Sequence, residues 1–321
     1  MIDQFNRTID YLRISITDRC NLRCRYCMPQ SVNWVEHAEV LRYEEILQIA
    51  AAAIEIGITH FKVTGGEPLV RKGVVDFIRQ LRSLPGCKAV TLTTNGILLQ
   101  QLAQPLADAG LDAVNVSLDA VDEKRYAEIT GMDGLHQVLQ GIDAALQAGI
   151  QTKINSVLLQ DAQDQIVPLA RLAQQKPVDV RFIELMPIGE GTQGGGVSPQ
   201  TARKLLLEQW QDLHPVEEKR GYGPARYEAS SQLTGRIGWI DAVSHGFCDQ
   251  CNRIRLTSTG QLKLCLCYEN GIDLRQMLRS GATQQQLQQA LQQVIVQKPA
   301  AHCFGTQQEI TENRLMAQIG G

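Results

Sequence analysis

Three cysteines near the start of the chain have the spacing of an iron–sulfur site. Cys20, Cys24 and Cys27 are separated by three and then by two residues. A cubane cluster has four irons, and cysteine thiolates normally fill all four positions. Three thiolates leave one iron open, and an open position distinguishes a catalytic metal site from a structural one. The spacing favours such a cluster over a zinc knuckle or scattered buried thiols, because no fourth Cys or His follows before His37.

A second group of three cysteines lies far along the chain, at Cys248, Cys251 and Cys265. Residues 252–257 and 261–266 alternate around a Ser-Thr-Gly turn, which predicts a hairpin. A hairpin centred there returns Cys265 opposite the residue two places after Cys251. The three thiols would then form one site, again with one ligand too few for a cube.

The remaining cysteines leave one alternative open. Cys267 shares the strand face of Cys265 and could be a fourth ligand, as in a structural zinc site. Cys87 and Cys303 have no ligand-like spacing and are expected to be plain thiols.

Composition narrows the class of protein. The chain has 321 residues, 44% of them apolar, which is enough for one large core and an appended module. The formal net charge of −3 provides no basic field for nucleic acid or a membrane surface. No targeting signal is evident, and the longest apolar run, 49–54, is far shorter than a membrane span. Nine cysteines, an odd number, fit ligands and reduced thiols, so we expect a cytoplasmic protein.

The first 186 residues alternate short β-rich segments with helical patterns, which predicts a parallel sheet with outer helices. The fold expected is α/β, a partial (βα)6 TIM-like barrel, followed after a Gly-rich stretch by a C-terminal α+β region. The domains would be 1–186 and 187–321. Expected strands are 11–17, 60–64, 89–94, 113–119, 152–158 and 178–184, and expected helices lie near 46–54, 73–84, 98–109, 135–148 and 162–174.

The strands have one aliphatic face and one polar face, because successive side chains point to opposite sides. The aliphatic faces must meet the helices, so the polar faces point into the barrel. Unpaired polar groups are costly to bury, which makes the interior a wet or liganded cavity. With Asp119 the one clear inward counter-charge, an anionic ligand is favoured over mutual ion pairing of the cations. The inward cations and hydroxyl are Arg13, Lys62, Thr93, Lys153 and Arg181, the last requiring a bend if Met186 also faces inward.

The loop after the second strand could approach a ligand closely. Gly65, Gly66, Glu67 and Pro68 follow Thr64, at the strand end where barrel active sites lie. Glycine admits a ligand to the backbone, and the carboxylate of Glu67 can accept hydrogen bonds from an ammonium group.

The first cysteine motif, with Tyr26 before its last cysteine, resembles the signature of the radical S-adenosylmethionine (SAM) enzymes. The resemblance implies a barrel of the radical SAM type and a [4Fe-4S] cluster whose open iron is chelated by SAM. Reductive cleavage of SAM would give a 5′-deoxyadenosyl radical. The glycine loop is similar to the site that holds the SAM amino group, which implies SAM contacts from Gly66 and Glu67.

The second cysteine group, with Asn252-Arg253-Ile254-Arg255 after it, is similar to the GTP 3′,8-cyclase family of molybdenum cofactor (molybdopterin) biosynthesis. This sequence departs from the family pattern at Asn6, where the family often has Gly, and in having the additional Cys267. Further matching segments are 10–15, 92–96, 115–119, 181–186, Lys298-Pro299 with His302, and the terminal 319–321.

This resemblance implies a lyase that converts GTP to (8S)-3′,8-cyclo-7,8-dihydroguanosine 5′-triphosphate. The radical would take hydrogen from C3′, and the sugar radical would add to C8. Two [4Fe-4S] clusters are implied, the second binding the guanine edge. The partners implied are GTP, SAM, a reductant and a downstream enzyme that forms cyclic pyranopterin, and a homodimer is allowed. Implied SAM contacts are Tyr26, Gly66, Ser117, Met186 and Glu67; implied GTP contacts are Arg13, Lys62, Thr93, Lys153, Arg181, Arg253, Ile254 and Arg255.

The chain ends in Gly320 and Gly321, which by themselves suggest an inert, frayed terminus. In the family such an end enters the active site. The resemblance therefore implies that these glycines lie near Arg253 and Arg255 and that all four residues act in catalysis.

Two rival functions remain. A radical SAM peptide-modifying enzyme would explain both cysteine groups but not the inward cations or the Gly-Gly end. A non-catalytic iron–sulfur or zinc protein would need saturated metal sites and no polar cavity.

Overall fold

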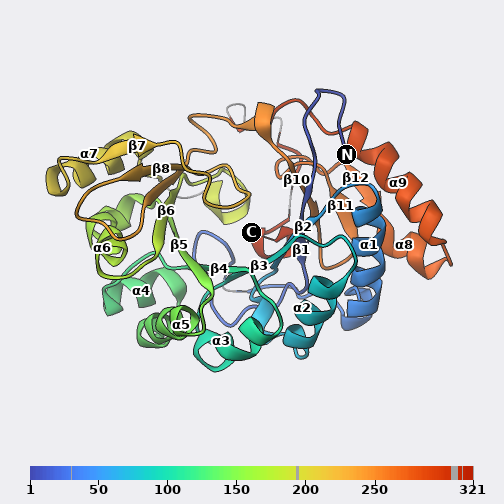
Figure 1. Ribbon diagram of the computed structural model, residues 1–321, viewed down its shortest axis with the longest axis horizontal. Helices are drawn as coiled ribbons and strands as arrows, with labels where there is room; N and C mark the ends of the chain where they lie inside the picture. The colour runs from blue at the N-terminus through green and yellow to red at the C-terminus, as the bar shows by residue number, and fades with distance from the viewer. Residues whose placement is uncertain (30, 193–194, 305–309, 313, 321) are drawn as a thin grey trace.

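The structure is a computed structural model that describes residues 1–29, 31–192, 195–304, 310–312 and 314–320. One sheet organises the fold, with its strands in an arc and its helices along the outer side (Figure 1). Six central strands lie side by side in chain order and pair in parallel. They are β1 (Tyr11–Ser15), β2 (His60–Thr64), β3 (Ala89–Thr94), β4 (Ala113–Ser117), β5 (Gln151–Val157) and β6 (Asp179–Ile183).

The helices between these strands cover the convex face. In α1, Ile46, Ile49, Ala50 and Ala53 are buried at helical spacing, and Gly57 follows in the left-handed conformation. None of the helices in the described ranges has the length and apolar character needed to cross a membrane. The helices are α1 (Tyr43–Glu55), α2 (Val74–Ser83), α3 (Leu99–Asp108), α4 (Glu123–Thr130), α5 (Leu135–Gln147) and α6 (Ile166–Gln175).

The second part of the chain extends the same sheet at both ends. β10 pairs in parallel with β1, and β9 pairs in parallel with β6. The full order is β12-β11-β10-β1-β2-β3-β4-β5-β6-β9-β8-β7. These strands are β7 (His214–Val216), β8 (Arg226–Ala229), β9 (Ile237–Ile240), β10 (Arg253–Leu256), β11 (Gln261–Lys263) and β12 (Gly271–Asp273), and the helices here are α7 (Pro199–Gln209), α8 (Leu274–Arg279), α9 (Gln284–Val296) and α10 (Met316–Ile319).

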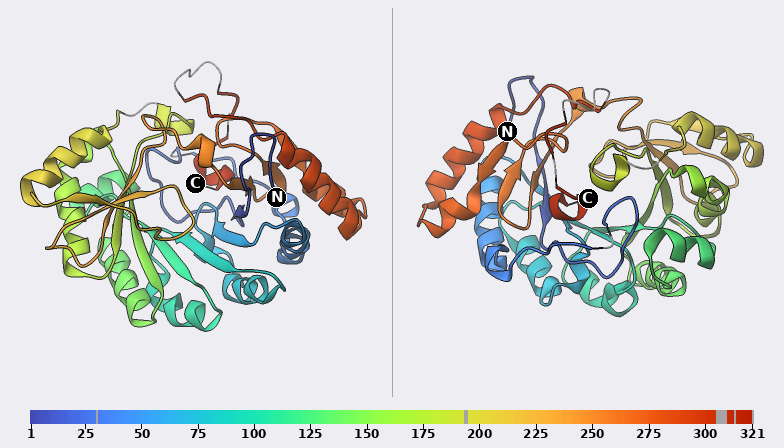
Figure 2. Two further views of the ribbon diagram at one scale, coloured as in Figure 1. Left: turned by 45° about the horizontal axis from the view of Figure 1, so that its top comes forward. Right: turned by 180° about the vertical axis from the view of Figure 1, so that it is seen from behind.

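The six predicted parallel strands and the five helices are confirmed, with ends that differ by a few residues. The predicted hairpin is also confirmed as β10 and β11. The helix α4 was not predicted. Neither were β7, β8, β9 and β12, because strands of three or four residues carry too little alternation. Their pairing places strands from the second part of the chain at both ends of the sheet (Figure 2).

The two faces of the sheet differ as expected. Leu12, Ile14, Phe61 and Val63 are fully buried in the core between sheet and helices. The concave face surrounds a cavity of about 1210 Å³. A bend in the sixth strand is not needed for Arg181 and Met186 both to face the cavity. The strand β6 ends at Ile183, and Met186 lines the cavity from the segment that follows.

Candidate active site

Both cysteine groups open onto the one cavity. Cys20, Cys24 and Cys27 line it from the loop after β1, and the second group lines it from the region around β10. The second group is Cys248, Cys251 and Cys265, as predicted.

The first cysteine loop is fixed by its own backbone. The amides of Cys27 and Met28 both donate to the Cys24 carbonyl, at 2.9 Å and 2.9 Å. Toward α4, the Arg23 amide donates to the Thr130 carbonyl at 2.8 Å. A short helical turn therefore holds the cysteines against the helix that sequence reasoning missed.

Hydrogen-bond donors approach one sulfur of this loop, that of Cys20. The Leu22 amide donates to the Cys20 sulfur at 3.4 Å, and the Asn95 side chain reaches it at 4.0 Å. Burial, and then the neighbouring thiols, raises the pKa of Cys24 and brings that of Cys27 to about 12. Because ligation requires thiolates, metal binding here displaces protons.

The second group is assembled from separate segments. Cys248 and Cys251 flank a short helical turn before β10, and Cys265 follows β11. The β10–β11 register pairs Arg255 with Lys263, so Cys265 lies two places further on, opposite Arg253. The His302 amide donates to the Cys248 sulfur at 3.3 Å, and the Arg253 guanidinium approaches the Cys251 sulfur at 3.9 Å. These donors fit a thiolate-bound cluster.

Two buried cations hold this second group together. The Arg7 guanidinium donates to the carbonyls of Cys248 at 2.7 Å and Pro299 at 2.7 Å, and it pairs with Asp3 at 2.7 Å. The ammonium of Lys298 donates to the Arg253 carbonyl at 2.9 Å. The Lys-Pro-x-x-His segment was noted in the sequence, but nothing there indicated Arg7.

Cys267 is separated from the cavity. Its sulfur lies 3.6 Å from that of Cys265, yet it is fully buried in a small cluster with Cys303 and Phe304 and does not line the cavity. Residues two apart in an extended segment share a face, so the thiols of Cys265 and Cys267 lie close together. Only the thiol of Cys265 lines the cavity.

The expected SAM contacts surround the first cysteine loop. Tyr26, Gly66, Ser117 and Met186 all line the cavity. The Tyr26 hydroxyl donates to Asp119 at 2.7 Å. A Cβ atom at Gly66 would lie 2.4 Å from the Arg19 carbonyl oxygen, so the loop path requires glycine.

Glu67 lies elsewhere than expected. Its carboxylate accepts hydrogen bonds from the Leu69 amide at 2.9 Å, the Thr94 hydroxyl at 2.7 Å and the Asn95 amide at 2.6 Å, and it does not line the cavity. Burial raises its pKa to about 7. Glu67 therefore joins the ends of β2 and β3 instead of presenting a free acceptor, a difference caused by backbone amides that no sequence motif displays.

The predicted cations and Thr93 converge on the cavity. Burial, and then Arg181, lowers the pKa of Lys153 to about 8. Burial together with Arg181 and Arg13 lowers the pKa of Lys62 well below its usual value. Mutual repulsion in a buried space favours an anionic ligand. The predicted residues that line the cavity are Arg13, Lys62, Thr93, Lys153, Arg181, Arg253 and Arg255.

The expectation of one inward acid was too narrow, since Asp10, Asp112, Glu184 and Glu218 also line the cavity beside Asp119. Most of these lie in loops beyond the strand ends, where strand parity says nothing.

Ile254 also departs from its expected role. Its side chain is 1% exposed and packs in the core, on the face of β10 opposite Arg253 and Arg255. Strand alternation makes this unavoidable once both arginines face the cavity. A substrate contact from the Ile254 side chain is therefore excluded.

The chain end enters the barrel opening, as Figure 1 shows near its centre. The Arg255 guanidinium donates to the Gly320 carbonyl at 2.7 Å. Gly320 adopts a left-handed conformation, and a Cβ atom there would lie 3.0 Å from the Thr64 side chain and 3.2 Å from that of Ser15. Gly321 lies outside the described residues.

Comparisons with known proteins agree with this architecture. Residues 14–173 match the model of the Radical SAM superfamily, and residues 178–304 match that of Molybdenum Cofactor Synthesis C. Among solved structures, SuiB of Streptococcus suis bound to S-adenosylmethionine has a TM-score of 0.62 at 15% identity, covering 81% of this chain and 61% of that one. The likeness to SuiB concerns the fold alone.

Curated relatives are much closer in sequence. GTP 3′,8-cyclases of Heliobacterium modesticaldum and Clostridium perfringens (strain SM101) are 44% and 41% identical, each over 100% of both chains. The Pseudomonas putida (strain W619) GTP 3′,8-cyclase is 42% identical over 100% of this chain and 98% of its own.

The fold, the first cysteine loop and the matched models define a radical SAM enzyme with [4Fe-4S] chemistry. Within that class, the chain belongs to the GTP 3′,8-cyclase family.

Proposed function

We propose that this chain is a lyase that converts GTP to (8S)-3′,8-cyclo-7,8-dihydroguanosine 5′-triphosphate in molybdenum cofactor biosynthesis. The observation that carries the proposal is the single cavity of about 1210 Å³, lined by two three-cysteine groups and by seven predicted polar or cationic side chains. An anionic purine nucleotide between two iron–sulfur centres fits such a lining.

The first cysteine loop would hold one [4Fe-4S] cluster and leave an iron for SAM. One-electron reduction of bound SAM at this cluster supplies the hydrogen-abstracting radical chemistry of the family. Cys20, Cys24 and Cys27 are the ligands, and the donors from Leu22 and Asn95 lie beside the Cys20 sulfur.

Four side chains or backbone positions would bind SAM around this loop. Gly66 admits the cofactor to the backbone after β2, because a side chain there has no room. Tyr26, Ser117 and Met186 complete the set, with the Tyr26 ring held by Asp119. Glu67 would act as a positioning residue that fixes the Gly66 loop against β3.

The second group, Cys248, Cys251 and Cys265, would hold the other [4Fe-4S] cluster and present the open iron to guanine. Arg253 lies beside the Cys251 sulfur, so it can reach both this site and the nucleotide. Arg7 and Lys298 would keep the segments around the three cysteines in place.

The cationic lining would bind the triphosphate. Arg13, Lys62, Lys153 and Arg181 repel one another in a buried space, which a polyanion relieves. The Asn155 side chain accepts from Arg181 at 2.9 Å and fixes its planar guanidinium, a group suited to bidentate phosphate contacts. Thr93 can donate from its hydroxyl.

The chain end would complete the active site. Arg255 holds the Gly320 carbonyl at 2.7 Å, inside the barrel opening. Gly320 and Gly321 would exclude water from the cyclising nucleotide and, with Arg253 and Arg255, bear on catalysis.

The reaction requires a reductant, and its product would pass to an enzyme that forms cyclic pyranopterin. Reduced thiols throughout the described chain suit a cytoplasmic enzyme, and a homodimer is compatible with this proposal. We assign the SAM side of the site to residues 1–186 and the second cluster to residues 187–321.

The test is anaerobic incubation of reconstituted protein with GTP, SAM and a reductant. We expect SAM-dependent loss of GTP with release of 5′-deoxyadenosine. Release of deoxyadenosine without consumption of GTP would favour another radical SAM substrate, and absence of both would refute the proposal.

A further inference from the structure

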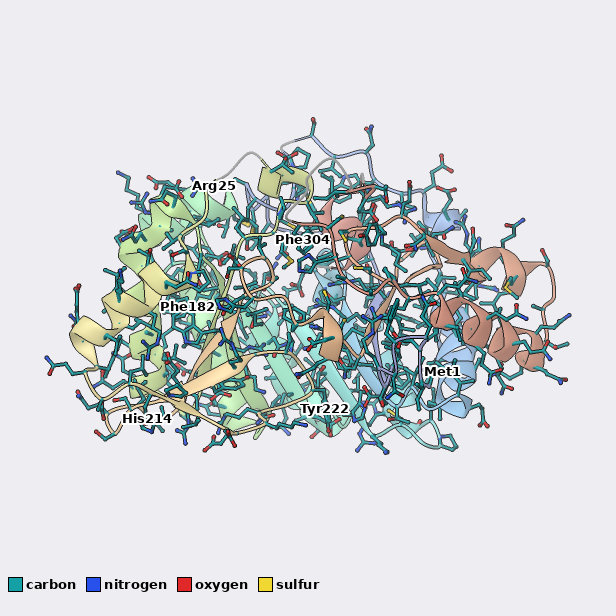
Figure 3. The ribbon with its side chains drawn as sticks, turned by 90° about the horizontal axis from the view of Figure 1, so that it is seen from above. Met1, Arg25, Phe182, His214, Tyr222 and Phe304 are labelled. Atoms are coloured by element: carbon teal, nitrogen blue, oxygen red, sulfur yellow. The ribbon has the colours of Figure 1, made fainter. Side chains whose placement is uncertain are left out.

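One segment at the cavity has no role in the function proposed so far. Between β7 and β8, residues 218–222 cross the amino end of the barrel, and we call them the floor segment. Its members Glu218, Lys219, Arg220, Gly221 and Tyr222 all line the cavity. Figure 3 shows Tyr222 on the side of the molecule opposite Arg25, which lies in the first cysteine loop.

The floor segment spans the barrel from one side to the other. On the β6 side, Arg220 pairs with Asp179 at 2.9 Å, and it also pairs with Glu218 at 3.1 Å. On the β2 side, the ring of Tyr222 lies 4.0 Å from that of His60, centroid to centroid. Because both ends are attached, the segment is a built closure and not a loose surface loop.

Its central contact is with a predicted GTP-binding residue. The Lys153 ammonium donates to the carbonyl of Arg220. Gly221 has φ +109°, and a Cβ atom there would lie 3.0 Å from the Lys153 nitrogen. Glycine is therefore needed twice, for the backbone conformation and for the approach of Lys153.

The Arg220 carbonyl is a neutral acceptor for a cation in a cation-rich space. A phosphate oxygen is charged, and hydrogen bonds between charged groups are stronger than those to a neutral carbonyl. Burial, and then Arg181, lowers the pKa of Lys153 although Asp179 raises it, so the ammonium gains from a further anionic partner. The Arg220 guanidinium is already paired with two carboxylates, which holds the floor segment in place.

We propose that the floor segment closes the phosphate end of the substrate cavity and selects for a nucleoside triphosphate. Lys153 leaves the Arg220 carbonyl for the terminal phosphate, and the Arg220–Gly221 backbone sets the depth of the cavity. With guanine at the second cysteine group, the phosphates extend toward this floor. This inference rests on the proposed function and adds the discrimination between GTP, GDP and GMP.

The test measures dissociation constants of GTP, GDP and GMP for the anaerobically reconstituted protein. Gly221→Ala should weaken GTP binding about tenfold and GMP binding less than about twofold, because only the longer anion reaches the floor. Gly195→Ala is the matched control, since Gly195 does not line the cavity, its added methyl group would lie 3.4 Å from the nearest atom, and its φ is not in the left-handed region. It should bind all three nucleotides as the unchanged chain does.

A second variant keeps the test decisive if Gly221→Ala fails to fold. Tyr222 is 46% exposed, so Tyr222→Leu removes the contact with His60 without opening the core. It should weaken GTP binding in the same selective way, with unchanged iron content. Equal losses for GTP and GMP, or no loss in either floor variant, would overturn the inference.

A different experimental result would contradict the proposed function itself. If Lys153→Ala leaves GTP affinity unchanged, or the unchanged chain binds no GTP, the cavity is not a GTP site. If Lys153→Ala weakens GTP while both floor variants do not, the function stands and only the floor inference falls.

Discussion

The two cysteine groups face one cavity but are built in opposite ways. Cys20, Cys24 and Cys27 come from one short loop after β1, held mainly by hydrogen bonds within the loop and to α4. The second group needs a hairpin, the N-terminal Arg7 and the segment around Lys298 to meet.

The two cysteine groups therefore depend on different contacts. A local loop keeps its ligand spacing whenever its own backbone forms. A site assembled from distant segments depends on long-range contacts, whose loss opens the site without touching a ligand. The chain end joins the two regions, because the Ala317 backbone contacts Cys27 while Arg255 holds Gly320.

The largest effects are expected when one predicted cluster ligand is removed from each cysteine group in turn. Cys24→Ala should lose about half the iron and all SAM cleavage, and Cys265→Ala should lose the other half but retain SAM cleavage, since each cube has its own ligands. Seven to eight irons are expected in the unchanged protein, as roughly two clusters of four. Iron analysis and deoxyadenosine release measure both. One zinc with four irons would contradict the two-cluster assignment.

Deleting Gly320 and Gly321 tests the connection between the regions. We expect loss of cyclisation with both clusters and GTP affinity nearly intact, because the tail contacts the cavity without carrying a ligand. Product formation is followed beside iron content and GTP binding. Full turnover by the truncated chain would restore the view of an inert terminus.

Arg7→Met tests whether the second site depends on distant contacts. The change removes the buried ion pair with Asp3 and the donor to several carbonyls, at a cost of about 3–5 kcal/mol. Iron should fall by up to half, with SAM cleavage preserved, as measured after reconstitution. Arg25→Ala is the control, because Arg25 belongs to the first loop and pairs with Asp161 at the exposed surface. Equal iron loss in both variants would contradict the comparison.

Lys153→Ala and Arg13→Ala address the cavity between the two sites. Each should weaken GTP binding by about 1.5–3 kcal/mol, or one to two orders of magnitude, with unchanged iron content. The pKa of Lys153 is lowered to about 8, so its positive charge is present below that pH and is lost above it. GTP affinity should therefore fall as pH rises through about 8. Lys153→Arg should remove this dependence, because arginine stays charged.

Cys267→Ala should have the smallest effect. The thiol is buried outside the cavity, so both clusters should form and stability should fall by about 1 kcal/mol, as measured by denaturant unfolding. Loss of half the iron, as in Cys265→Ala, would make Cys267 a ligand.

Much of the cavity wall was determined by sequence alone. Alternation in the six parallel strands put Arg13, Lys62 and Lys153 on the concave face, and the structure agrees. Strand parity is a local property of the backbone, so it survives without knowledge of the fold. The same rule, applied to the segment 253–255, turns the Ile254 side chain away from the cavity.

Only the tertiary structure decided the rest. Glu67 accepts a hydrogen bond from the Asn95 amide after β3, Arg7 donates to the Cys248 carbonyl, and Lys153 donates to the Arg220 carbonyl of the floor segment. Each is a contact between residues far apart in sequence, made by backbone groups that every residue carries. A sequence pattern reports what a side chain is and which face it takes, whereas hydrogen bonds to a distant backbone depend on the packed arrangement of the sheet.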